Sequence, residues 1–474
     1  MSTFGGLGIA SSGLSAARAA LEVTGQNVAN ANTEGYTRQR VDQSPVAQTS
    51  LATYFRQSSV GDGVHVTGVG RVNDAVVDAR VNSTASNAAY WSTSSSAVSA
   101  VEASLNEPTT SGLAAQMSTF FADWQTMANT VGTTSAAGAA NALMQQGQLV
   151  ASTISSGYAA AAQGWSEARS AAASTVTTIN DTASKIADLN ASIRSLTASG
   201  GNVNTLLDQR DAAVTKLAGL TGATTRGNAD GTIDVVVGGN TLVSAGTTRA
   251  VALGGATDFS QVSGNPVKLT WADAGTGVSL DGGEMAARVA ALQPADAAGS
   301  GTGGVYAEAA KAYNDVATAL ATQVNAVHTT GTTSTGATGL RFFDFTSAAG
   351  PPAANLFVVP TSVSGIAAAD GTRGNYDNSI ADRIAQIGGT TGSPNASWST
   401  YVSRIGSQSS TASARATTAG TAATAATTAQ TSVSGVDLDE ETSNLVIFQH
   451  AYQASARVIS TINDVLDTLI RMGA

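Results

Sequence analysis

Two stretches at opposite ends of the chain carry small or apolar residues at alternating steps of three and four positions. The first runs from Leu7 to Ala31 and the second from Leu445 to Leu469. This spacing places one stripe on one face of a helix, and no charged residue lies in either stripe. Because neither helix can bury its stripe alone, we expect the two to pair as coiled-coil helices and to contact neighbouring molecules. The expected anchors of this assembly interface are Leu7, Leu14, Leu21, Val28, Leu445, Phe448, Tyr452, Ile459, Ile462, Leu466 and Leu469.

The first helix is expected over residues 3–33, although its composition is poor for a helix. Its five glycines each cost roughly 1 kcal/mol relative to Ala in a helix interior, and they are Gly5, Gly6, Gly8, Gly13 and Gly25. We therefore expect this end to be mobile in the monomer and ordered by packing. The last helix is expected to start at Asp437, where acidic side chains suit the positive helix N-terminus.

The first half of the interior changes from an extended to a helical pattern. Residues 36–75 alternate or carry β-branched side chains, which predicts strands, with a turn at Gly61–Gly63. Residues 74–219 then follow a helical pattern. Two breaks interrupt it, one at Asn106–Pro108 and the other near Gly132–Gly138.

Strand patterns dominate residues 222–282, which we predict to be a β insert between helical regions. Gly238–Asn240 separates two β-branched runs and predicts a hairpin. Lys268–Trp271 and Val278–Leu280 are further predicted strands.

The helical pattern returns after the insert, over residues 284–293 and 305–328. Residues 340–345 and 355–359 predict strands of a smaller sheet. Residues 397–433, rich in Ala, Thr and Ser, are compatible with a long, lightly packed helix. The predicted fold class is therefore α+β, mainly helical.

The composition favours a folded protein with a weakly charged surface. Of the 474 residues, 42% are apolar and 12% are charged, which is about half of the usual charged share of roughly 25%. Such a surface tolerates close packing against copies of itself. The net charge of −10 argues against nucleic acid and against an anionic membrane as partners, because both attract basic surfaces. No cysteine is present, so disulfides and thiolate chemistry are excluded.

The sequence offers little catalytic chemistry. His65, His328 and His450 lie far apart and in no metal-binding motif, so no metal, cofactor or catalytic residue is expected. Asp208 and Asp211 lie three positions apart on a predicted helix, where two carboxylates could perform acid–base catalysis. A solvated helix face with a local ion pair is the favoured interpretation of these acids.

A motif after the first stripe resembles the N-terminal signature of the bacterial flagellar rod, hook and hook-associated proteins. Its ending, Gly35 to Gln39, is similar to the hook-associated branch of this family. Residues 206–211 and 340–344 resemble the family's middle segments. Residues 434–441 and 448–457 resemble its C-terminal signature. The motif residues are Asn27, Asn30, Asn32, Thr33, Gly35, Tyr36, Arg38 and Gln39.

This resemblance implies a structural protein at the junction between the flagellar hook and filament, and no enzyme. Copies of the chain, the hook protein and a second junction protein would be its partners. A cytosolic export chaperone would hold the C-terminal helix before secretion. The first 17 residues lack a basic residue and an unbroken apolar run, so we expect export from the cell without a cleaved signal peptide.

The resemblance also implies a layered organisation in three parts. Residues 1–35 and 437–474 would form a terminal-helix assembly domain. Residues 36–220 and 284–436 would form a helical core domain with a small sheet, and residues 221–283 an inserted outer β domain.

Two groups of alternatives stay open from the sequence. Another flagellar axial protein, such as a hook, rod or second junction component, is the nearest one. A secreted hydrolase or a surface adhesin belongs to a different class; the hydrolase would need a clustered acid pair or metal site in the β insert, and the adhesin does not explain the terminal stripes.

Overall fold

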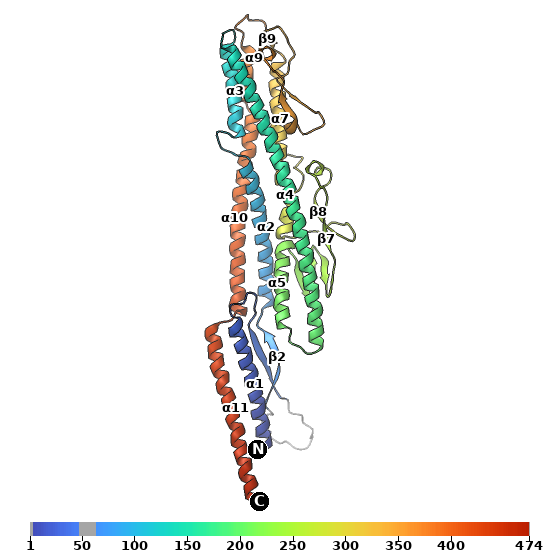
Figure 1. The fold of residues 1–474 in the computed structure, drawn as a ribbon, viewed down its shortest axis with the longest axis vertical. Helices are drawn as coiled ribbons and strands as arrows, with labels where there is room; N and C mark the ends of the chain where they lie inside the picture. Colours follow the sequence, from blue (N-terminus) through green and yellow to red (C-terminus); the bar gives the residue numbers. More distant parts are fainter. Residues whose placement is uncertain (1–2, 47–62, 474) are drawn as a thin grey trace.

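The computed structural model describes residues 3–46 and 63–473, and the predicted turn at Gly61–Gly63 lies mostly outside them. The described chain forms a long, narrow rod of helices with small sheets along its flank (Figure 1). Both termini lie at one end of the rod. The predicted α+β, mainly helical fold is confirmed.

The end that carries the termini is formed by two helices and one hairpin. Helix α1 (Thr3–Asn30) runs antiparallel to helix α11 (Leu438–Gly473). Strands β1 (Gln39–Pro45) and β2 (Val64–Arg71) pair antiparallel and pack on α1. The carboxylate of Asp437 accepts hydrogen bonds from the backbone N–H groups of residues 439 and 440, so the predicted N-terminus of the last helix is confirmed.

Long helices form the body of the rod, and the two predicted breaks separate the first three of them. Helices α2 and α10 lie side by side along much of its length. The α10 face toward α2 carries an alanine every seven residues, and these small side chains allow the two helices to approach closely. The helices of the body are α2 (Ala75–Ser104), α3 (Leu113–Thr130), α4 (Ala136–Ala198), α5 (Asn204–Thr221), α6 (Gly283–Ala291), α7 (Val305–His328) and α10 (Pro394–Ser434).

Residues 224–271 form two antiparallel sheets that pack against α4. A four-stranded sheet follows chain order, with β4 and β5 meeting at the predicted hairpin, and a second sheet pairs β7 with β8. Val278–Leu280 is predicted as a strand, but the structure has no strand there. The neighbouring Gly277 forms an isolated bridge with Thr270. The strands are β3 (Thr224–Gly227), β4 (Ile233–Val237), β5 (Asn240–Ser244), β6 (Thr247–Thr248), β7 (Val251–Gly254) and β8 (Lys268–Trp271), with a 3-10 turn, η1, at Phe259–Gln261.

The far end of the rod carries short elements around α3 and α7. The predicted strands near residues 340–345 and 355–359 are present as β10 (Phe343–Phe345) and β11 (Leu356–Val358), which pair antiparallel. A second two-stranded sheet joins β9 (Thr332–Thr333) to β12 (Ala367–Ala369). The remaining elements are α8 (Pro352–Asn355), η2 (Val363–Gly365) and α9 (Ser379–Ile387).

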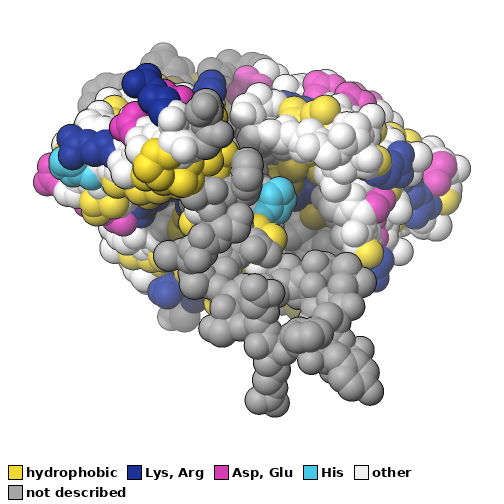
Figure 2. Space-filling model, turned by 90° about the horizontal axis from the view of Figure 1, so that it is seen from below, with side chains coloured by type: hydrophobic (Ala, Val, Ile, Leu, Met, Phe, Trp, Pro, Cys, Tyr) yellow, Lys and Arg dark blue, Asp and Glu magenta, His cyan; other side chains and the backbone are white. Residues whose placement is uncertain are grey.

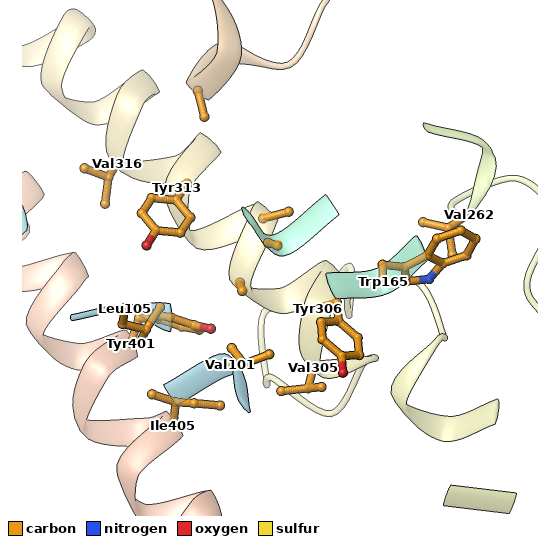
Figure 3. Packing of buried hydrophobic residues seen from close by; sticks show 14 of the residues in the cluster. Val101, Leu105, Trp165, Val262, Val305, Tyr306, Tyr313, Val316, Tyr401 and Ile405 are labelled. Atoms are coloured by element: carbon orange, nitrogen blue, oxygen red, sulfur yellow. The ribbon is translucent and has the colours of Figure 1, made fainter. Parts of the chain in front are cut away.

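One hydrophobic core runs through the body, and no described residue of α1 or α11 belongs to it. Figure 3 shows the part in which Val101 of α2 and Leu105, directly after α2, meet Tyr401 and Ile405 of α10 near Tyr313 of α7. None of the helices in the described part of the chain combines the length and apolarity needed to cross a bilayer.

Candidate assembly interface

Helices α1 and α11 contact each other in a seven-residue register. A Cβ atom on Gly6 would lie 3.2 Å from Ile462 Cδ1, and one on Gly13 would lie 3.2 Å from Ser455 Oγ. Seven positions along α1 thus correspond to seven positions back along α11. The two glycines leave room for α11 to lie close, which gives these helix-weakening residues a packing role.

The buried stripe of α1 consists mainly of small side chains rather than of the leucines. Leu7, Leu14 and Leu21, predicted as anchors, are half-buried. Val28 is 41% exposed in the single chain, so its role in the assembly interface stays a prediction. The close approach of α11 and the β1–β2 hairpin favours small residues on both contacting flanks of α1. The buried members are Ala10, Ala16, Ala17, Ala20, Val23, Thr24 and Asn27.

The predicted stripe of α11 faces α1 along most of the helix. Tyr452 and Leu469 are more exposed, at 39% and 51%, so their role in the assembly interface stays a prediction. Leu469 lies one heptad beyond Ile462, which already faces Gly6 near the start of α1. The half-buried members are Leu445, Phe448, Ile459, Ile462 and Leu466.

The rest of α11 exposes large apolar side chains. Ile447 is 59%, Val458 is 47% and Ile470 is 68% exposed, because α1 covers only one flank of the helix. Figure 2, which views the molecule from the end with the termini, shows hydrophobic side chains at the surface beside the residues drawn in grey. An exposed apolar face of this kind marks an interaction surface.

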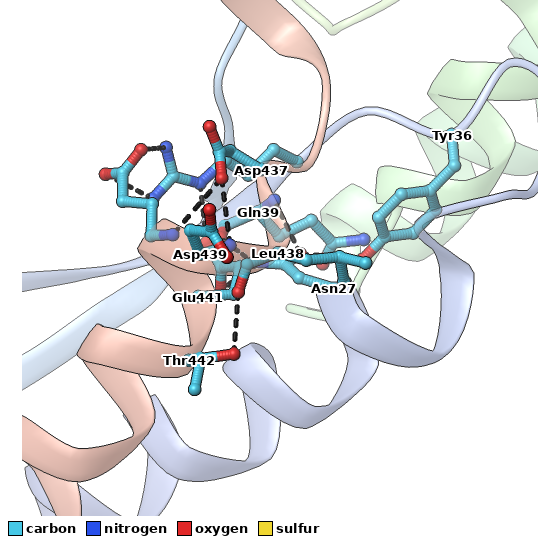
Figure 4. Close-up of polar contacts among 10 residues, drawn as sticks. Asn27, Tyr36, Gln39, Asp437, Leu438, Asp439, Glu441 and Thr442 are labelled. Atoms are coloured by element: carbon cyan, nitrogen blue, oxygen red, sulfur yellow. Dashed lines mark hydrogen bonds and ion pairs between the residues drawn. The ribbon is translucent and has the colours of Figure 1, made fainter.

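A buried amide, Asn27, joins the upper ends of the two terminal helices (Figure 4). Its Nδ2 donates to the Gln39 carbonyl at 2.9 Å and to Glu441 Oε2 at 3.1 Å. Its Oδ1 accepts from the Gln39 backbone N–H at 3.0 Å and from the Tyr36 hydroxyl at 2.9 Å. Asn27 is 1% exposed, and all its polar capacity is used by residues of β1, α11 and the connecting turn.

Two acids at the start of α11 bind one guanidinium. Arg38 donates two parallel hydrogen bonds to Glu440, at 2.8 and 2.9 Å, and a third from Nε to Glu441 at 2.7 Å. The hydrogen bonds that Arg38 donates to Glu440 contribute most to raising the pKa of Arg38 above its usual value. The backbone N–H of Arg38 also donates to the Ser434 carbonyl at the end of α10. One residue therefore fixes both sides of the α10–α11 connection.

The environment of Tyr36 keeps its hydroxyl protonated. Partial burial, reinforced by the charges of Asp208 and Glu441, raises the pKa of Tyr36. The neutral phenol can therefore donate to Asn27 throughout the physiological pH range.

A second ion pair joins the hairpin to the body. Arg71 of β2 contacts Asp208 at 2.7 Å and Asp211 at 2.8 Å. Burial alone lowers the pKa of Arg71, but the two carboxylates outweigh it and hold the pKa above its usual value. Asp208 also accepts from the Thr37 backbone N–H at 3.3 Å. The predicted solvated helix face with a local ion pair holds only in part. The Asp208 side chain is 9% exposed and pairs with the distant Arg71. The local Arg210 lies 3.7 Å from Asp211 and donates to the Gly231 carbonyl.

Asn204 at the start of α5 completes this joint. Its Nδ2 donates to Gln39 Oε1 at 3.0 Å and to the Val69 carbonyl at 2.9 Å. Both Asn204 and Gln39 are 5% exposed. Below, "the joint" means Asn27, Tyr36, Arg38, Gln39, Arg71, Asn204, Asp208, Asp211, Glu440 and Glu441.

The other motif residues lie in the exposed turn after α1. Asn30 donates to the Gln26 carbonyl, and Thr33 donates to Asn30 Oδ1. Asn32 is exposed, and Gly35 adopts a φ of 77°, which a residue with a side chain rarely tolerates. These four residues shape the chain reversal that places Tyr36 and Arg38 beside α11.

The sequence interpretation named the motif but missed Asn204, Arg71 and Glu441 as its partners. Glu441 is one of the acidic side chains expected to suit the start of the last helix, and no partner is predicted for it. The sequence does contain a signal for the contact with Glu441, because a basic residue in one terminal motif and adjacent acids in the other indicate an ion pair.

The described residues offer no site for a metal, since no three His, Asp or Glu side chains gather closely enough to hold one. His328 is buried between two backbone groups: its Nδ1 lies 2.7 Å from the Leu340 carbonyl, and its Nε2 lies 2.9 Å from the Ala367 N–H. Burial lowers its pKa. His65 and His450 are exposed.

Three family profiles match the chain. The helical domain of the flagellar hook-associated protein FlgK matches residues 98–343. The C-terminal region of the flagellar basal body rod FlgEFG proteins matches residues 430–472, and the flagella basal body rod protein profile matches residues 7–37. The two shorter matches contain the predicted terminal stripes completely.

Individual relatives agree with these profiles. Flagellar hook-associated protein 1 of Bacillus subtilis is 29% identical, with 99% of this chain and 98% of the relative covered. The protein of the same name in Escherichia coli is 27% identical, with 98% of each covered.

Among solved structures, the flagellar hook junction protein FlgK of Burkholderia pseudomallei has a similar fold. The TM-score is 0.62 at 17% identity, and the match covers 75% of this chain and 100% of that one. The FlgK profile spans more than half of this sequence, so the chain belongs to the FlgK family of flagellar hook-associated proteins.

Proposed function

We propose that this chain is a structural subunit of the bacterial flagellum at the junction between hook and filament. It assembles through its terminal helices with copies of itself and with other axial subunits. Membership of the FlgK family supports the flagellar role. The observation that carries the assembly role is the apolar face of α11, which α1 leaves exposed at Ile447, Val458 and Val465.

The composition of this face favours burial against protein. Between Ser443 and Asn463 its only charged side chain is Arg457, so about five helical turns can be desolvated with little electrostatic cost. In this proposal, apolar side chains that the α1–α11 contact leaves exposed contact the next subunit. Val28, Tyr452 and Leu469, exposed in the single chain, belong to this proposed interface together with the half-buried anchors of both helices.

The contact between subunits is heterologous in this proposal, because a flagellar axis grows by repetition rather than by closure of a dimer. The hook protein on one side and a second junction protein on the other are the proposed neighbours. Before export, a cytosolic chaperone covers the apolar face of α11. The assembled protein lies outside the cell, and its role is structural rather than catalytic.

We also propose the three-part division of the chain. The terminal domain comprises residues 1–35 and 437–474, and the joint links it to the core domain of residues 36–220 and 284–436. Residues 221–283 form the outer β domain. The hydrophobic core supports the separate terminal domain, because it includes no described residue of the terminal helices, whereas the β insert shares the core of the body.

The location is tested by immunogold labelling of isolated flagella with antibodies against this chain. We expect gold particles only at the boundary between hook and filament. Label along the whole filament or along the hook would contradict the junction role and favour another axial protein. Flagella from a strain that lacks the gene provide the control for antibody specificity.

A further inference from the structure

A groove of about 690 Å³ lies between α2 and the start of the β insert, away from the terminal helices. One face of α2 forms its longer wall, and residues Gly222–Thr225 and Leu280–Gly282 form the opposite side. Its volume falls within the usual range for small-molecule sites. The polar and aromatic side chains on the α2 wall are Asn82, Ser83, Ser86, Asn87, Tyr90 and Trp91.

The floor of the groove is kept open by glycines. Gly222, with a φ of 73°, crosses Gly282 so closely that a Cβ on Gly222 would lie 2.9 Å from the Gly282 nitrogen. A Cβ on Gly282 would lie 2.7 Å from Ser86 Oγ. Side chains at these two positions would displace the crossing or fill the space above Ser86. The hollow is therefore a consequence of specific residues rather than of loose packing.

Two aromatic rings form one end of the groove. Tyr90 and Trp91 stand at 88° to each other with centroids 5.0 Å apart. The guanidinium of Arg415 from α10 lies over the Trp91 ring, 4.5 Å from its centroid, and holds the ring from the side of a neighbouring cavity. Because these contacts restrict both rings, a ligand meets a pre-formed aromatic wall.

The polar groups of the groove are mostly uncharged. Asn87 and Asp281 are exposed, and neither side chain makes a hydrogen bond within the described part of the chain. Thr224 and Thr225 belong to β3, the edge strand of its sheet, so one side of that strand is open toward a ligand. Asp281 is the only charged residue in the lining, which disfavours phosphate and other anionic ligands.

We propose that this groove binds a neutral carbohydrate. Sugar rings offer an apolar face of C–H groups, which packs on the rings of Tyr90 and Trp91, and hydroxyl groups, which bond to amides and carboxylates. Asn87 and Asp281 supply donor and acceptor groups for those hydroxyls, and Asn82 adds an amide nitrogen. Its carbonyl oxygen is already occupied by the Thr215 hydroxyl at 2.7 Å.

Tryptophan fluorescence provides a local readout of binding. Of the five tryptophans, Trp124, Trp165, Trp271 and Trp398 are at most 2% exposed, whereas Trp91 is partly exposed and lines the groove. We would titrate the full chain with maltose, cellobiose and N,N′-diacetylchitobiose. We expect a saturable blue shift with at least one of them, at half-saturation of roughly 1 mM.

The variant Asn87→Ala retains the fluorescent reporter and removes one proposed contact. It should raise the half-saturation concentration at least roughly tenfold. Asn141→Ala removes an equally exposed helical amide on α4, far along the sequence from the groove, and should bind as the wild type does. Equal circular dichroism spectra establish that both variants fold.

Three outcomes would overturn the proposal. The first is the absence of a saturable shift with all three sugars. The second is equal weakening by Asn87→Ala and Asn141→Ala. The third is a saturable response to acetylcholine alone, which would identify the aromatic wall and Asp281 as a site for a quaternary ammonium ion. The measurement uses unassembled protein, so its result is independent of the proposed place in the flagellum.

Discussion

At the scale of single residues, the two acids of the joint that bind Arg38 differ clearly in importance. Glu441 is 2% exposed and binds both Arg38 and Asn27, whereas the Glu440 side chain is 56% exposed. A buried carboxylate that loses its partner retains an uncompensated charge, while an exposed one is solvated by water. Arg38 is thus important mainly through Glu441, even though Glu440 holds it with two hydrogen bonds.

The first prediction concerns Arg38→Ala. We expect it to destabilise the α1–α11 pair by about 2 kcal/mol, because Glu441 stays buried without its cation. Amide hydrogen exchange along α11 should accelerate roughly 30-fold in consequence. Glu440→Gln should change exchange less than threefold.

Arg18→Ala is the matched control, since Arg18 pairs with Glu22 on α1 and both side chains are exposed. We expect little change in that variant. If Arg38→Ala and Arg18→Ala gave the same exchange rates, the joint would have no role in holding α11.

The second prediction concerns His328 and pH. Its neutral ring accepts from the Ala367 N–H, and burial lowers its pKa in the folded state. The unfolded chain therefore binds this proton more readily, and the folded state loses stability as the pH falls below the ordinary value of roughly 6.5. Denaturant unfolding should show a falling free energy between pH 7 and pH 5.

The variant His328→Gln should be less stable at pH 7 but show a flatter pH profile over this interval. His450→Gln, at an exposed position of α11, should keep the wild-type slope. An unchanged slope in His328→Gln would assign the pH dependence to other groups.

At the scale of elements, α11 has a two-sided design. Its inner stripe packs on α1, and its outer flank exposes large apolar side chains at a similar helical spacing. A helix that is apolar on more than one flank is typical of a buried environment. Within one molecule, α1 covers only one apolar flank of α11, and the other flank has no surface to pack against in the described part of the chain.

The third prediction follows from this outer flank. Val458→Asp should leave the soluble monomer folded, because Val458 is 47% exposed, but it should prevent incorporation into flagella, where the charge would be desolvated. Immunoblots of isolated flagella and motility of a strain that carries only the variant provide the measurement.

Leu149→Asp is the control, since Leu149 on α4 has the same exposure of 47%. That strain should assemble flagella and swim. Normal incorporation of Val458→Asp would contradict the role of the outer flank, and failure of both variants would indicate a general defect of export or folding.

At the scale of the whole molecule, the rod consists of a cored body and a terminal pair that lacks a core of its own. The buried residues of α1 are mostly alanines, and large apolar side chains of α11 stay half-exposed. The terminal pair therefore depends on the joint and on neighbouring molecules for much of its stability.

The fourth prediction concerns removal of α11. A chain that ends at Gly435 should keep the thermal midpoint of the body within about 2 °C of the full-length value, because no described residue of α11 belongs to the core. Near-ultraviolet circular dichroism, which reports on the four buried tryptophans, follows this transition. A decrease of more than about 5 °C would mean that the terminal pair stabilises the body.

The sequence by itself determined most elements of this protein. The three-and-four spacing placed both terminal helices, and turn residues separated α2, α3 and α4 and marked the hairpin between β4 and β5. These features are local, since periodicity, caps and backbone breaks act within a few residues. The strand predicted at Val278–Leu280 failed because the pairing with β8 does not continue beyond a single bridge at Gly277 and the hydrogen bond from Val278.

Only the tertiary structure decided how the motifs work. The stripes gave the heptad spacing, but the close approach at Gly6 and Gly13 decided that alanines rather than leucines line the α1 contact. Glu441 lies more than 400 positions from both Asn27 and Arg38, and no local pattern states which side chains meet. Their contacts depend on the antiparallel register of α1 and α11, which the packing of the whole terminal end fixes.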